Sequence, residues 1–127
     1  MPPAATSTEI PSQRTLRFWL AASVVSLNVL TSAFFSLRAV IDTSLSGTGL
    51  GHTASLYTLA RSLPLALGVL VSIAVGSRAS LLGLGFTMAL VQAMDASIGQ
   101  DEMAIWGPAA FAVLTVAACT ALWRQRR

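Results

Sequence analysis

Several strongly polar side chains lie within long apolar stretches of this sequence. They include Asn28, Arg61, Gln92 and Asp95. Because an ionised side chain at the centre of a membrane costs roughly 2.5–3.5 kcal/mol on insertion scales, such residues face the interior of a helix bundle and find partners there. Arg61 and Asp95 can form an ion pair, and the two amides can hydrogen-bond between helices. Such groups could hold a small anionic or quinone-like ligand, or pass a proton.

Spacing places several polar residues on common helical faces. The first apolar stretch has one face at steps of three and four residues, and this face carries nearly all of the stretch's strong polarity. The third stretch has a face with the same spacing. The first face consists of Asn28, Thr31, Phe35, Arg38 and Asp42, and the second of Gly85, Met88, Gln92, Asp95 and Gly99.

The rise of a helix predicts how deep each polar group lies below the outer end of its stretch. Arg61 lies about 12 Å below that end, Gln92 about 9 Å, and Asp95 and Arg38 about 5 Å. Since arginine side chains extend toward the interface, we expect all four to line a small polar cavity, with Tyr57 beside them. The candidate ligand-binding residues are therefore Arg38, Arg61, Gln92, Asp95, Asn28 and Tyr57.

Two ion pairs are expected among these groups. Arg61 and Asp95 form the first, and Arg38 and Asp42, four residues apart on one helix, form the second. The pairs have a structural interpretation as well, in which they only fix helix register while the amides join neighbouring helices. The sequence leaves both interpretations open.

Catalytic chemistry is not indicated. Cys119 and His52 are the only cysteine and the only histidine, so one chain has no Cys/His zinc site. The glycine-rich segment 47–51 lacks the lysine of a phosphate-binding loop. No catalytic residue and no metal site are predicted, the sequence favours a protein that is not an enzyme, and it leaves any cofactor undetermined.

Composition identifies the class of protein. Of 127 residues, 54% are hydrophobic and 10% are charged, and the mean hydropathy is +0.71. A soluble domain carries about 25% charged residues, so this composition excludes a disordered chain, a disulfide scaffold and almost any soluble enzyme. The net charge of +3 comes with no nucleic-acid-binding motif. The expected partner is a lipid bilayer, and no nucleic acid is expected.

The apolar stretches predict an all-α integral membrane four-helix bundle. Each has about the 20 residues that a spanning helix needs. A disordered tail is expected before them, a Gly/Ser/Thr-rich connection after the first, a tight link after the second and a short acidic loop after the third. The expected boundaries are 1–15 for the tail, 16–41, 53–75, 79–98 and 104–123 for the spans, 42–52 for the connection, 76–78 for the link, 99–102 for the loop and 124–127 for a basic tail.

The charges that flank the spans predict the orientation. With four crossings, six of the eight arginines fall on one side, whereas the opposite loops contain acids and no Lys or Arg. By the positive-inside rule both termini are cytoplasmic. Trp19 and Trp123 then lie at the inner interface and Trp106 at the outer one. The expected location is a bacterial cytoplasmic membrane, crossed several times.

A different interpretation makes residues 1–33 a signal peptide. Arg14 and Arg17 would form its basic region, and 31–33 its cleavage site. Against this, apolar character and the polar face of the first stretch continue past the cleavage site.

Three functions fit these features. The first is an accessory or ligand-binding protein whose polar pocket near the outer face takes a lipid, a quinone or a small anion. The second is an assembly subunit that binds another membrane protein or a second copy through small residues in the second stretch. The third is a small proton-coupled transporter dependent on Asp95. The small residues are Ala60, Pro64, Gly68, Ser72 and Gly76.

Part of the chain resembles small bacterial membrane proteins of the DoxX-like four-helix group. Ala60-Arg61 and the Gln92…Asp95…Gly99 segment carry the resemblance, which covers most of residues 16–123. It implies a four-helix bundle in a bacterial cytoplasmic membrane, near redox or quinone chemistry, and assigns no catalytic residue. The small multidrug-resistance transporters have an essential Glu in their first span, whereas the first stretch here has no acid at membrane depth.

Overall fold

The computed structural model describes residues 11–46, 49–98 and 102–124. These residues form four α-helices, each long and apolar enough to cross a membrane. The fold is therefore all-α with four helices, as the composition and the apolar stretches predict. The helices are α1 (Pro11–Ser46), α2 (Gly49–Ala74), α3 (Arg78–Ile98) and α4 (Glu102–Trp123).

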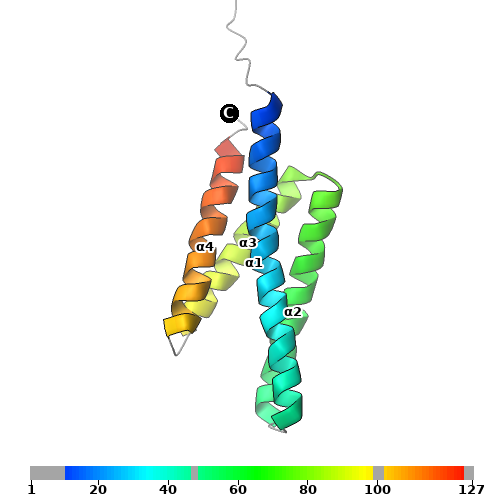
Figure 1. Ribbon diagram of the computed structural model, residues 1–127, viewed down its shortest axis with the longest axis vertical. Coiled ribbons are helices and arrows are strands. Elements are labelled where there is room, and N and C mark those ends of the chain that lie inside the picture. The colour runs from blue at the N-terminus through cyan, green and yellow to red at the C-terminus, as the bar shows by residue number, and fades with distance from the viewer. Residues whose placement is uncertain (1–10, 47–48, 99–101, 125–127) are drawn as a thin grey trace, which may run out of the picture.

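The helices form two antiparallel hairpins, α1 with α2 and α3 with α4 (Figure 1). The start of α1 and the end of α4 lie at the same end of the bundle, which we call the terminal end. The opposite end, the hairpin end, is uneven, because the α1–α2 hairpin extends well past the α3–α4 hairpin. Helix length explains this difference, since α1 has 36 residues and α3 has 21.

Several expected boundaries differ from the structure. Arg78 of the expected link begins α3, and Glu102 of the expected loop begins α4. The first helix begins at Pro11, so residues 11–15 are helical and not part of a disordered tail. Residues 42–46 and 49–52, expected in a connection, belong to α1 and α2. Hydropathy marks the lipid-facing part of a helix, whereas backbone hydrogen bonding continues beyond it into polar sequence. The expectations for residues 1–10, 47–48, 99–101 and 125–127 lie outside the described residues.

The predicted tight link between α2 and α3 is present and has a defined hydrogen-bond pattern. Gly76 has a φ of 68°, a left-handed conformation that glycine adopts without steric penalty. The Ser77 amide donates to the Ser72 carbonyl at 2.8 Å and the Gly76 amide to the Ile73 carbonyl at 3.0 Å, which is a Schellman motif. The Ser77 hydroxyl then caps α3 by accepting from the Ser80 amide at 3.3 Å.

The hydrophobic core fills the half of the bundle nearest the terminal end. Small and aliphatic side chains from all four helices form it, and α3 approaches α1 and α4 closely at Gly85. A Cβ atom at Gly85 would lie 2.5 Å from the Cys119 Sγ and 3.2 Å from a Val25 methyl group. Cleavage after residue 33 would remove the α1 part of this core. The core residues are Ala21, Ala22, Val25, Val29, Ala66, Val69, Leu81, Leu82, Met88, Cys119 and Leu122.

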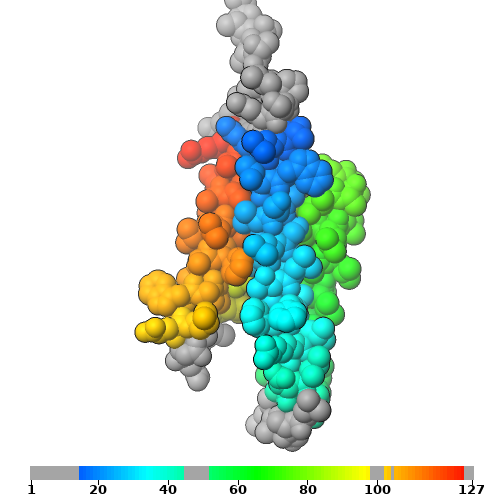
Figure 2. All heavy atoms as spheres, viewed as in Figure 1, coloured from blue at the N-terminus to red at the C-terminus, as the bar shows by residue number. Residues whose placement is uncertain are grey.

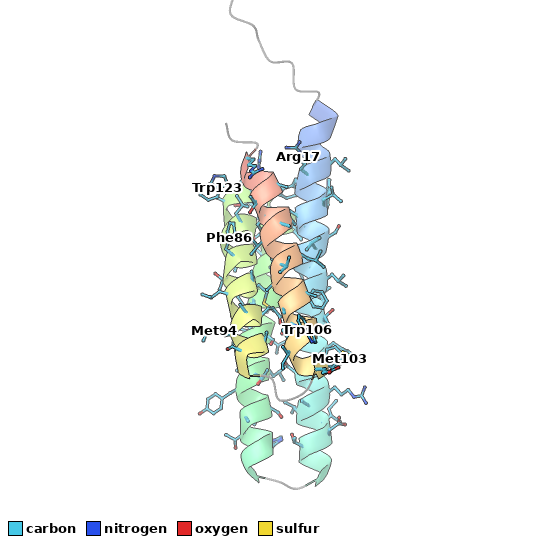
Figure 3. The ribbon with its side chains drawn as sticks, turned by 90° about the vertical axis from the view of Figure 1, so that its left-hand side faces the viewer. Arg17, Phe86, Met94, Met103, Trp106 and Trp123 are labelled. Atoms are coloured by element: carbon cyan, nitrogen blue, oxygen red, sulfur yellow. The ribbon has the colours of Figure 1, made fainter. Side chains whose placement is uncertain are left out.

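Two tryptophans mark the ends of α4. Figure 3 shows Trp123 and Arg17 both toward the terminal end, and Trp106 toward the hairpin end. Both rings are exposed. The stretch of helix between them is about 25 Å long, which is close to the thickness of a bilayer's hydrocarbon core of about 30 Å.

Candidate functional site

A buried hydrogen-bonded chain of three side chains joins α1, α3 and α4. The Gln92 Nε2 donates to the Asn28 Oδ1 at 2.6 Å, and the Asn28 Nδ2 donates to the Thr115 Oγ1 at 2.9 Å. Asn28 and Thr115 have no exposed surface, and Gln92 is 6% exposed. Polar groups this well buried need such partners, since an unsatisfied one is costly in an apolar medium.

The predicted ion pair between α2 and α3 is present. One guanidinium nitrogen of Arg61 contacts both Asp95 carboxylate oxygens, at 3.1 and 3.2 Å. The Arg61 side chain is 42% exposed and that of Asp95 28%. Asp95 lies one helical turn beyond Gln92 on α3, so the pair and the buried chain occupy neighbouring positions.

A cluster of three serine hydroxyls lies between α1 and α2. The Ser62 Oγ is 3.3 Å from the Ser32 Oγ and 3.1 Å from the Ser36 Oγ. The Ser36 hydroxyl also donates to the Ser32 carbonyl at 2.8 Å, and the Ser62 hydroxyl to the Thr58 carbonyl at 2.9 Å. Ser36 and Ser62 are almost completely buried. We call Ser32, Ser36 and Ser62 the serine cluster.

Near the hairpin end, a groove of about 680 Å³ opens between the two hairpins. Figure 2 shows the recess between α1 and the first half of α4. Its wall is mostly apolar, and the polar groups described above lie along it. All four helices contribute lining residues, which are Thr31, Ser32, Phe35, Ser36 and Ala39 of α1, Ala54, Ser55 and Thr58 of α2, Gln92 and Asp95 of α3, and Met103, Gly107, Pro108 and Phe111 of α4.

The structure brings together four of the six candidate residues. Gln92 and Asp95 line the groove, Arg61 contacts Asp95, and Asn28 contacts Gln92. These residues connect the groove to all four helices, because Thr115 of α4 extends the chain at Asn28.

The expected convergence of Arg38 and Tyr57 on this site is not found. Arg38 pairs with Asp42 at 3.6 Å, as predicted, but both side chains are about two-thirds exposed and neither lines the groove. At 100° a residue, Arg38 lies about 80° around α1 from Asn28, which carries it out of the groove. Tyr57 is 75% exposed, since it precedes the groove residue Thr58 and points about 100° away from it.

Sequence reasoning missed the serine cluster and the part that α4 plays. The candidate residues predicted from the sequence include none from the last span, yet this span supplies Thr115 to the buried chain and Phe111 to the groove. The only sequence signal for this cluster is weak: hydroxyl residues recur at a spacing of four, as Ser32 and Ser36 on α1 and as Thr58 and Ser62 on α2.

Other candidate features have structural roles. In the small-residue face of α2, Gly68 packs against Leu84 of α3, and the buried Ser72 donates to the Gly68 carbonyl at 2.7 Å. His52 lies 3.4 Å from the Thr43 hydroxyl near the hairpin end. Among the described residues, no three His, Cys, Asp or Glu side chains lie close enough together to hold a metal ion.

Comparison with models of known families, with curated proteins and with solved structures found no match to this chain. The resemblance to the DoxX-like group therefore stays a prediction from the sequence, and the site is interpreted from its own geometry.

Proposed function

We propose that this protein binds a neutral amphipathic molecule of the membrane, of lipid-like or quinone-like chemistry, in the groove between its two hairpins. The observation that carries the proposal is a groove of about 680 Å³ whose apolar wall contains a short row of hydrogen-bonding groups. Pockets for small molecules combine these two features, since apolar surface supplies affinity and a few polar groups fix orientation.

The apolar wall suits an aliphatic or aromatic body. Phe35 of α1 and Met103, Pro108 and Phe111 of α4 line the groove, and the small side chains of Ala39 and Ala54 line it as well. A methionine thioether adapts to bodies of different shape, and two phenyl rings can stack on a flat one. The groove is open to the side of the bundle, so a molecule could enter it from the lipid phase.

The electrostatics of the groove disfavour the small anion that the sequence also allowed. The Asp95 carboxylate lines the groove, whereas Arg61 lies outside the lining and its guanidinium is paired with that carboxylate. An anion in the groove would be repelled by the Asp95 carboxylate, and the Arg61 guanidinium that could attract it is already paired with that carboxylate. A neutral ligand meets no such repulsion.

The protein is proposed to lie in a bacterial cytoplasmic membrane, with its terminal end in the cytoplasm. Support comes from the arginines at that end and from Trp106 and Trp123, which are about one hydrocarbon thickness apart. The groove then lies in the outer half of the bilayer. With no catalytic group in the proposed role, the protein acts as a binding or accessory protein.

Photolabelling in lipid nanodiscs tests the proposal. A monoacylglycerol with a diazirine in its acyl chain should label Phe35, Met103 and Phe111, and excess unlabelled monoacylglycerol should suppress this labelling. Gly107→Leu should abolish it, because Gly107 lines the groove and a Cβ there has no atom within 4 Å, so that the new side chain has room to fill the groove.

The matched control is Gly83→Leu. Gly83 is exposed, lies outside the groove, and a Cβ there also has no atom within 4 Å. This variant should keep saturable labelling of the groove. The proposal is wrong if labelling does not saturate, spreads evenly over outer residues such as Leu70 and Val113, and is indifferent to Gly107→Leu.

A further inference from the structure

The hydroxyls of the serine cluster have too few hydrogens for their contacts. Four contacts involve Ser32, Ser36 and Ser62: two with helix carbonyls and two between hydroxyl oxygens. Each hydroxyl has a single hydrogen, so three hydrogens serve four contacts. At least one contact at a time brings two oxygens together with no hydrogen between them.

The helix carbonyls determine which contact lacks its hydrogen. Ser36 and Ser62 donate to carbonyls one turn earlier in their own helices, at 2.8 and 2.9 Å. The Ser32 hydrogen can then serve the Ser32–Ser62 contact. The Ser36–Ser62 contact at 3.1 Å has none left. Ser32 and Ser36, which both line the groove, therefore present oxygen lone pairs to it.

Other groove groups share this excess of acceptors. The Thr58 hydroxyl donates to the Ala54 carbonyl at 3.0 Å, which leaves its oxygen as an acceptor. Gln92 uses one amide hydrogen on Asn28 and retains its carbonyl oxygen. The Asp95 carboxylate is acceptor-only, with room for about four hydrogen bonds. Against these, Thr31 and the second Gln92 amide hydrogen can donate.

The charge of the site selects a neutral donor over a cation. Arg61 faces Asp95 from α2 and neutralises it at 3.1 Å. A cationic headgroup would compete with a guanidinium that is already in place, whereas a hydroxyl can use the remaining carboxylate lone pairs without displacing it.

We propose that the ligand's polar end is a neutral hydrogen-bond donor, an alcohol, diol or hydroquinone hydroxyl, and that it donates to the acceptor-rich edge formed by Ser32, Ser36 and Asp95. This inference rests on the proposed function and specifies its ligand class. An ether, ester or quinone head can only accept hydrogen bonds, so its oxygen lone pairs would lie against those of the groove with no hydrogen between them. Such a head loses a hydrogen bond and leaves the polar groups of the groove unsatisfied.

Competition against the monoacylglycerol photoprobe tests the inference with a matched pair. Dodecanol and dodecyl methyl ether share a chain, but only the alcohol donates a hydrogen bond. When each competitor is titrated into the nanodisc, dodecanol should suppress groove labelling by half at a mole fraction about five- to tenfold lower than the ether needs, the ratio expected for one net hydrogen bond. Ser36→Ala should reduce this ratio toward one, because it removes a groove acceptor.

Asp95→Asn gives the sharper test, because it replaces an acceptor-only group with an amide of the same shape that can donate. The ratio of ether to alcohol content needed for equal suppression should fall at least threefold, because the ether can accept from the new amide. Thr87→Ala is the control: Thr87 is exposed, donates to the Gly83 carbonyl of its own helix and lies outside the groove, so the ratio should not change. If Asp95→Asn fails to fold, Ser36→Ala still decides.

The outcomes separate this inference from the proposed function. If neither competitor suppresses labelling and the probe itself is not saturable, ligand binding in the groove is refuted. If both suppress it equally, or the ether is stronger, the groove binds amphiphiles but the donor inference is overturned. A preference for the alcohol that Ser36→Ala and Asp95→Asn leave intact also overturns it, since the donor would then be recognised elsewhere.

Discussion

Asn28 joins three helices through a single side chain. Its amide accepts from Gln92 of α3 and donates to Thr115 of α4, while its own backbone belongs to α1. In a membrane, apolar side chains gain little by leaving lipid for protein, and interhelical hydrogen bonds therefore contribute to which helices associate. The buried chain holds α3 against α1 at the level where the groove begins.

We expect Asn28→Ala to lower the free energy of unfolding by about 1–2 kcal/mol. The substitution removes two interhelical hydrogen bonds, each worth about 0.6 kcal/mol in membrane proteins and up to about 1.7. Steric trapping in bicelles would measure it. In a cycle with Gln92→Ala, the two substitutions should be less than additive, because both remove the same 2.6 Å bond. Full additivity would show that the pair does not interact.

Strong polarity explains why part of the site could be predicted from the sequence. Asn28, Gln92, Arg61 and Asp95 stand out in apolar stretches, and burying any of them without a partner is unfavourable. Serines carry no such signal, because a serine in a helix can satisfy itself on its own backbone, as Ser36 does at 2.8 Å. Which serines turn inward depends on the neighbouring helix.

The first helix shows where face analysis loses accuracy. Steps of three and four residues place Asn28 and Arg38 on one broad stripe, but at 100° a residue Arg38 lies about 80° to one side of Asn28. Ser36 lies about 80° to the other side, toward α2, and contacts Ser62 there. The stripe therefore contains both the groove wall and an exposed ion pair, and only the packing distinguishes them.

At the scale of elements, the bundle depends on one close approach. Gly85 lets α3 approach α1 and α4, with Cys119 and Val25 in the space that a side chain would need. The length and apolar character of the four spans were predictable, because crossing a bilayer requires both. The angle between the hairpins, which creates the groove, leaves no local pattern in the sequence, since it depends on long-range fits such as this one.

Gly85→Ala should destabilise the bundle by about 1–3 kcal/mol, the usual penalty for overpacking. The added methyl would lie 2.5 Å from the Cys119 Sγ, and both residues are buried. Gly83→Ala is the control on the same helix, and should be neutral or slightly stabilising because its Cβ meets open space.

Adding Cys119→Ala to Gly85→Ala should restore part of the lost stability. Thermal unfolding of these variants and the parent protein in one detergent would measure this, and equal stability of the Gly85→Ala and Gly83→Ala variants would contradict close packing.

At the scale of the whole molecule, charge is unevenly distributed between the two ends. Arg17 lies at the terminal end. Arg78, which donates to the Leu122 carbonyl at 2.9 Å, and Arg124, which follows the end of α4, lie there as well. Arg38 and Arg61, which lie toward the hairpin end, are each paired with a carboxylate that offsets their charge. An excess of basic charge beside the spans resists translocation across the bacterial membrane, so this distribution underlies the proposed orientation.

Single-cysteine labelling in intact bacteria would test that orientation. The native Cys119 is buried, and Cys119→Ala gives a cysteine-free background. Ser44→Cys, at an exposed site near the hairpin end, should react with a membrane-impermeant maleimide in intact cells. Ala79→Cys, at an exposed site beside the α2–α3 turn, should react only after permeabilisation. Each variant is the other's control, because both sites are exposed in the folded bundle.

The reverse pattern would place the groove in the inner half of the bilayer, where its ligand would come from the cytoplasmic leaflet. Equal labelling of both sites in intact cells would instead indicate dual topology, with two antiparallel copies presenting the groove to both leaflets.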